Sequence, residues 1–104
     1  MAEYPEYLSL ISLAVPAAAV PAVVSGDSTA LSCLGGDLLG ESSLTYTWSA
    51  TSAPPGALVS FSRNASNLAK NTVATLDTPG DYELTCIISN GLSRVSSSVR
   101  VVKT

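Results

Sequence analysis

The sequence has no histidine, so it lacks the commonest general base and the commonest nitrogen ligand for metals. Nucleophilic sites built on Ser-His-Asp or Cys-His pairs are therefore excluded. Charged residues are also scarce, at 12% of 104 residues with a net charge of −3. The basic residues are scattered, so we expect no nucleic-acid binding: Arg63, Lys70, Arg94, Arg100 and Lys103.

Motifs for cofactors, metals and membranes are missing as well. The glycines of GGDLLG lack the lysine and the strand–helix context of a phosphate loop, and no D-x-D-x-D-G calcium loop occurs. No apolar run is long enough to span a bilayer. The acidic pairs Asp37 with Glu41 and Asp77 with Asp81 fit solvated turns better than glycosidase or calcium chemistry. We expect a protein that is not an enzyme, has no cofactor and does not insert into membranes.

Serine, threonine, valine and leucine dominate the chain, which favours short strands over long helices. Three segments alternate apolar and polar residues with the period of two that half-buried strands show. The pattern predicts that the aromatic residues Tyr46, Trp48 and Tyr82 belong to the core. The apolar faces hold, in order, Leu31 and Cys33; Leu44, Tyr46 and Trp48; and Tyr82, Leu84, Cys86 and Ile88.

Cys33, Trp48 and Cys86 all fall on these apolar faces. Inward positions of two facing sheets can bring two cysteines within disulfide distance, and we predict a Cys33–Cys86 bridge. Such a bridge would close a loop of about 54 residues and stabilise the fold by about 4 kcal/mol. It would also indicate an oxidising compartment. The alternative is two buried thiols that pack as small hydrophobic groups.

Turn signals divide the chain into seven or eight short strands, which predicts an all-β Greek-key sandwich of two antiparallel sheets in one domain. Asn90-Gly91 is the strongest hairpin signal. Pro16 and Pro21 predict an edge strand that is broken and switches from one sheet to the other. The expected strands after this edge strand cover 28–34, 44–51, 58–62, 72–76, 81–89 and 94–102.

Residues 1–16 read as an N-terminal arm or an extra edge strand, with the sandwich at 17–104. A signal peptide over residues 1–19 is a weaker alternative, because Glu3 and Glu6 give the start of the chain the wrong charge. Tyrosine is enriched at interfaces, so the arm is a candidate contact surface and could support a homodimer. Its candidate interface residues are Tyr4, Tyr7, Leu8 and Leu10.

From about residue 17 the chain resembles immunoglobulin-like modules related to PKD domains, which repeat in large bacterial secreted and surface proteins. The matching stretches are LTYTWSATSAPPGALVSF, RNASNLAKNTVATLDTPGDYELTCIISNGLS and VSSSVRVV. Two departures stand out. Trp48 is followed by Ser-Ala-Thr rather than the W-D-F-G-D-G run of many PKD domains. Cys33 and Cys86 replace apolar residues, as in true immunoglobulin domains or as in a disulfide introduced by design.

The resemblance implies an extracellular or cell-surface module that acts as a structural spacer beside neighbouring modules. The alternative is a natural or engineered module that binds a protein or a glycan through its end loops or its N-terminal arm. Asn64-Ala65-Ser66 is a glycosylation sequon, which a bacterial origin makes a weak candidate.

Overall fold

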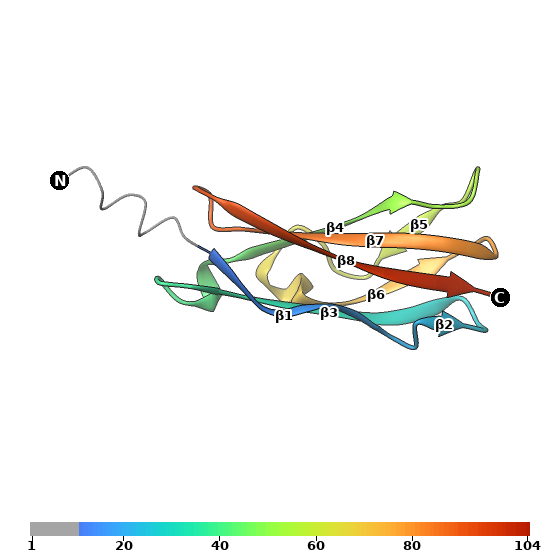
Figure 1. Ribbon diagram of the computed structural model, residues 1–104, viewed down its shortest axis with the longest axis horizontal. Helices are drawn as coiled ribbons and strands as arrows, with labels where there is room; N and C mark the ends of the chain where they lie inside the picture. Colours follow the sequence, from blue (N-terminus) through green and yellow to red (C-terminus); the bar gives the residue numbers. More distant parts are fainter. Residues whose placement is uncertain (1–10) are drawn as a thin grey trace.

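A computed structural model describes residues 11–104, and it confirms the predicted all-β sandwich (Figure 1). Eight strands form two sheets of four, and two single-turn 3₁₀ helices interrupt them. No helix in this range is long and apolar enough to cross a membrane. The elements are β1 (Ile11–Val20), β2 (Val23–Val24), β3 (Ser28–Asp37), η1 (Glu41–Ser43), β4 (Thr45–Ser52), β5 (Val59–Phe61), η2 (Asn67–Lys70), β6 (Asn71–Leu76), β7 (Gly80–Ser89) and β8 (Arg94–Lys103).

The strand order is β1-β3-β6-β5 in one sheet, called here the β1 sheet, and β2-β8-β7-β4 in the other, called the β4 sheet. Neighbours run antiparallel except β2 and β8, which are parallel. The predicted switch of the first edge strand is confirmed, because β1 borders one sheet and β2 borders the other. Pro21 lies at the break between them, and Pro16 lies where the β1–β3 register shifts.

The core lies between the sheets and is built from the alternating residues. Leu31, Leu76 and Ala74 cover the inner face of the β1 sheet, and Tyr46, Trp48, Tyr82, Leu84 and Ile88 cover that of the β4 sheet. Tyr46, Trp48 and Tyr82 are all buried, on the inner face where the alternation places them. Phe61 of β5 is partly buried and packs against this core.

Two boundaries differ from the sequence expectation. β3 continues to Asp37, because Gly35 and Gly36 pair with Leu13 and Ser12 of β1 where a connecting loop was expected. A side chain at Gly35 would press on Ile88 and Leu44, so only glycine lets β3 continue there without shifting its neighbours. The boundary placed between residues 16 and 17 falls inside β1, which runs from Ile11 to Val20.

Candidate functional site

The cysteine–tryptophan frame lies at the centre of the core. Trp48 of β4 pairs with Cys86 of β7, and Cys33 lies on β3 of the opposite sheet. Both cysteines are buried free thiols. The two thiols are hydrogen-bond partners. This bond lowers the pKa of Cys33 and raises the pKa of Cys86. The structure thus places the two sulfurs together, and the bridge itself stays a prediction.

The indole N–H of Trp48 connects β4 to η2. Its indole Nε1 donates a buried 2.7 Å hydrogen bond to the carbonyl of Ala69, which lies just before β6. At the free edge of β4, the side-chain amide of Asn64 accepts from the Trp48 N–H (2.7 Å) and donates to the Trp48 carbonyl (2.9 Å). The sequon asparagine therefore closes part of an exposed strand edge, a role that the sequence pattern did not indicate.

A second polar cluster fixes the β3–β4 connection. The Tyr46 hydroxyl donates to Glu41 Oε2 (2.8 Å) and accepts from the Gly35 N–H (3.0 Å). Lys70 Nζ donates to Glu41 Oε1 at 2.7 Å. Burial, helped by the bond to Glu41, raises the pKa of Tyr46 to about 12. Burial alone would raise the pKa of Glu41, but hydrogen bonds from Lys70, Tyr46 and Asn67 outweigh it and hold that pKa low.

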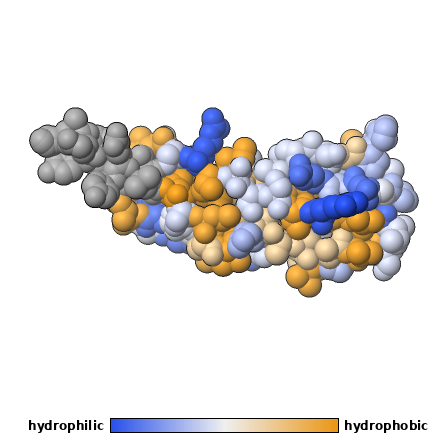
Figure 2. Space-filling model, viewed as in Figure 1, coloured by the Kyte–Doolittle hydropathy of each residue, from blue (hydrophilic) through white to orange (hydrophobic). Residues whose placement is uncertain are grey.

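One end of the sandwich presents leucines on fixed loops. Leu38 and Leu39 in the β3–β4 loop are each 63% exposed, and Leu92 in the β7–β8 loop is 72% exposed. Asp37 ties the two loops together, because its carboxylate accepts from the Leu39 N–H (3.0 Å) and from Asn90 Nδ2 (3.0 Å). The Leu39 N–H, followed by Asn90, lowers the pKa of Asp37. We call Leu38, Leu39 and Leu92 the leucine end; Figure 2 shows hydrophobic surface near this end and also along the rest of the visible face.

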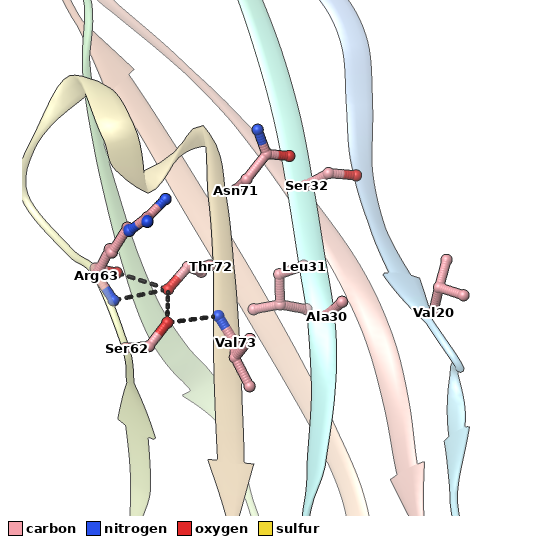
Figure 3. Close-up of a pocket in the computed structure, with 9 residues that line it drawn as sticks. All are labelled: Val20, Ala30, Leu31, Ser32, Ser62, Arg63, Asn71, Thr72 and Val73. Carbon is pink, nitrogen blue, oxygen red and sulfur yellow. Dashed lines mark hydrogen bonds between the residues drawn. The ribbon is translucent and has the colours of Figure 1, made fainter.

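The outer face of the β1 sheet carries a shallow hollow of about 480 Å³ (Figure 3). Ala30 forms its apolar floor, and exposed Val20 and Val73 stand on either side. Thr72 Oγ1 holds the backbone of Arg63 by accepting from its N–H (2.9 Å) and donating to its carbonyl (2.8 Å). We call this feature the outer hollow; its lining includes Val20, Ala30, Ser32, Arg63, Asn71 and Val73.

Three polar side chains of the outer hollow are unused by the fold. Within residues 11–104, the Arg63 guanidinium, the Asn71 amide and the Ser32 hydroxyl make no hydrogen bond, and Figure 3 draws bonds only around Ser62, Thr72 and the Arg63 backbone. No carboxylate lies on the outward face of β3, β5 or β6. The hollow therefore offers donors, one positive charge and apolar walls.

The remaining expected site residues divide into two groups. Tyr4, Tyr7, Leu8 and Leu10 of the predicted arm interface lie outside the described residues. Asp77 and Asp81 flank one turn but have separate partners, since Asp77 Oδ1 accepts from the Leu58 N–H and Asp81 pairs with Arg100. In residues 11–104, no group of His, Cys, Asp and Glu side chains is suited to hold a metal ion.

Neither a protein family nor a curated protein matches this chain. Among solved structures, a similar one is described as the ZirS C-terminal domain, with a TM-score of 0.50 and 8% sequence identity. The similarity covers 93% of this chain and 66% of that one, so this chain spans just under two-thirds of its length. At this identity the likeness concerns the fold alone.

Proposed function

We propose that this domain is a non-catalytic, immunoglobulin-like spacer module of an extracellular or cell-surface protein. The strand orders β1-β3-β6-β5 and β2-β8-β7-β4 have the arrangement of immunoglobulin sandwiches, which supports this reading. The chain enters beside Asp37 at one end of the sandwich and leaves beside Val24 at the other (Figure 1). Modules joined in series through such ends would be held apart by the full length of each sandwich.

The observation that carries the proposal is the parallel pairing of β2 with β8. The Val102 N–H donates to the Ala22 carbonyl and the Thr104 N–H to the Val24 carbonyl, both at 2.9 Å. Tension that pulls the two ends of the chain apart would load these bonds in shear, all at once. Lys103 Nζ reinforces the junction by donating to the Gly26 carbonyl (2.6 Å) and to Asp27 (3.1 Å).

Pulling single molecules by their two ends tests the proposal. We expect Lys103→Met to lower the unfolding force, because methionine keeps the buried aliphatic stem and loses the Nζ contacts. Arg100→Met is the matched control, since it removes only the exposed pair with Asp81 at 2.8 Å. Equal unfolding forces for the two variants and the parent chain would refute the proposal that the β2–β8 junction resists tension.

A binding module is the second candidate, and the leucine end favours it. Exposed leucines on two loops fixed by Asp37 form the kind of apolar patch that marks protein contacts. Probing protein and glycan arrays with Leu38→Ser and Leu68→Ser tests this role, because the two leucines are matched in exposure at 63% and 62%. Binding lost only in Leu38→Ser would support the role, and an array without any bound partner would reject it.

We also propose that Cys33 and Cys86 form a disulfide in the oxidising compartment where such a module works. Their burial and contact at the centre of the core support the bridge. Thiol titration of the denatured protein, purified without reductant, is the test. We expect no reactive thiol, whereas two reactive thiols would show that the pair is a packing contact only.

A further inference from the structure

The outer hollow contains an arginine, Arg63, whose backbone is held by Thr72 and whose guanidinium makes no hydrogen bond or ion pair within residues 11–104. We propose that the outer hollow binds a carboxylate of the acidic N-terminal segment of a second copy of this chain. The spacer role neither requires nor implies this contact.

The lining of the outer hollow suits a carboxylate group that has an apolar side chain next to it. The planar guanidinium of Arg63 can bind a carboxylate through two parallel hydrogen bonds. The Thr72 hydroxyl bonds both the N–H and the carbonyl of Arg63, so little ordering of that backbone would be needed on binding. The Asn71 amide on β6 and the Ser32 hydroxyl, farther across the sheet on β3, add hydrogen-bonding groups with no partner within residues 11–104 (Figure 3). Val20 and Val73 offer contacts for a flanking side chain.

A peptide fits this lining better than a sugar does. No aromatic ring lines the hollow, whereas stacking on aromatic rings is a common way to hold an apolar sugar face. The chain supplies a peptide of matching chemistry, since residues 1–10 contain Glu3 and Glu6 and no lysine or arginine. Each glutamate is followed directly by a tyrosine, and tyrosine is favoured at interfaces.

Reach limits which glutamate of the same chain could contact Arg63. Ser32 pairs with Ala18, seven residues along β1 from Ile11, which is about 23 Å at ~3.3 Å per residue. Arg63 follows β5, three strand spacings from β1, or about 14 Å across the sheet. The separation is thus about 27 Å, while Glu6 can reach only about 18 Å from Ile11 and Glu3 about 29 Å when fully extended. Within one chain only Glu3 could reach Arg63, and only when the segment is almost fully extended, whereas either glutamate of a second copy can reach it.

Sedimentation velocity of the full chain, from micromolar to millimolar concentration, tests the proposal. We expect a weak dimer that weakens as salt rises, because the contact is an exposed ion pair. Arg63→Glu should weaken it about fivefold or more. Arg94→Glu is the matched control, since it makes the same charge change at an exposed arginine outside the hollow.

Two further variants make the result specific. Glu3→Gln with Glu6→Gln should weaken the dimer as Arg63→Glu does, and Arg63→Glu combined with Glu3→Lys and Glu6→Lys should restore it. The guanidinium makes no hydrogen bond or ion pair within residues 11–104, so Arg63→Glu should leave the melting temperature unchanged and any weakening of the dimer can be read as lost binding. A monomer at every concentration, or a dimer that Arg63→Glu leaves intact, would overturn the proposal.

The same samples separate this proposal from docking within one chain. Amide resonances of Ser32, Arg63 and Asn71 should shift with protein concentration if the segment comes from a second copy. Shifts caused by Glu3→Gln with Glu6→Gln that do not depend on concentration would place the segment on its own domain, and would overturn the second-copy assignment. Neither outcome bears on the unfolding force, so the spacer proposal is judged separately.

Discussion

The two sheets differ in how far their outward polar side chains are hydrogen-bonded to one another. On the β4 sheet, Thr51 Oγ1 bonds Thr85 Oγ1 at 2.9 Å, Thr85 bonds Ser98 Oγ at 2.8 Å, and Asp81 pairs with Arg100. On the β1 sheet, the side chains of Ser32, Arg63 and Asn71 in the outer hollow have no such partners within residues 11–104. A ligand on the β4 sheet would have to replace existing bonds, whereas a ligand on the β1 sheet would add new ones.

The inner faces show a related difference. The β4 sheet contributes the large aromatic residues Tyr46, Trp48 and Tyr82, and each sends its polar atom to a partner outside that sheet. The β1 sheet contributes aliphatic residues such as Leu31 and Leu76. We infer that the β4 sheet supplies most of the specific stabilisation and the β1 sheet most of the free binding capacity. The variants below test this division, from the largest expected effect to the smallest.

Replacing Trp48 with alanine should give the largest loss, about 3–5 kcal/mol in the free energy of unfolding, because a buried aromatic ring leaves a cavity. Urea unfolding measures it. Trp48→Phe keeps an aromatic ring but removes the five-membered ring of the indole together with the 2.7 Å bond to Ala69, and leaving that carbonyl without this donor should itself cost about 1–3 kcal/mol. A loss below about 1 kcal/mol for Trp48→Ala would contradict the central place of the β4 sheet.

Tyr46→Phe should lower the free energy of unfolding by about 1–3 kcal/mol, because it leaves the Gly35 N–H without its hydroxyl acceptor. Tyr82→Phe is the comparison, since the Tyr82 hydroxyl bonds only the backbone of Thr78. We expect a smaller loss there, near 1 kcal/mol. The denaturant midpoints of the two variants show which substitution costs more stability. A larger loss for Tyr82→Phe would contradict the greater contribution that we expect from the Tyr46 hydroxyl.

Alkaline pH probes the same Tyr46 hydroxyl without a substitution. Its pKa is raised from 10.0 to about 12 in the folded chain, so folding favours the neutral form. The stability that this provides is fully present below pH 10.0, and it is lost as pH rises towards about 12. Unfolding curves across this window should show the decline, and Tyr46→Phe should flatten it. An unchanged slope in Tyr46→Phe would assign the decline to other groups.

Much of the fold could be predicted because burial repeats with a simple period. Alternation alone identified the inward residues of β3, β4 and β7, and the two prolines predicted where the first strand changes sheets. The outer hollow could not be predicted in this way. Ser32, Arg63 and Asn71 come from three separate segments, and only the pairing of β6 with both β3 and β5 brings them together. The part that Asn64 plays at the β4 edge is equally invisible in the sequence, because a side chain there replaces a strand.

A pair of threonine variants compares the two outer faces directly. Thr85→Val on the β4 sheet should cost about 1 kcal/mol, because its hydroxyl joins Thr51 to Ser98. Thr75→Val on the outward face of β6 makes the same change where the hydroxyl has no bond within the described range, so stability should stay within about 0.5 kcal/mol of the parent. Equal losses in thermal unfolding would mean that the hydroxyl chain of the β4 sheet contributes nothing beyond shape.

The smallest effect on stability is expected for Asn71→Ala and Ser32→Ala, which should each change it by less than about 0.5 kcal/mol. Neither side chain is bonded within residues 11–104, so no partner is left unsatisfied when it is removed. Thermal unfolding of both variants measures this. A loss above about 1 kcal/mol would show that the fold already uses these groups. The outer hollow would then resemble the outer face of the β4 sheet, and the contrast between the two sheets would disappear.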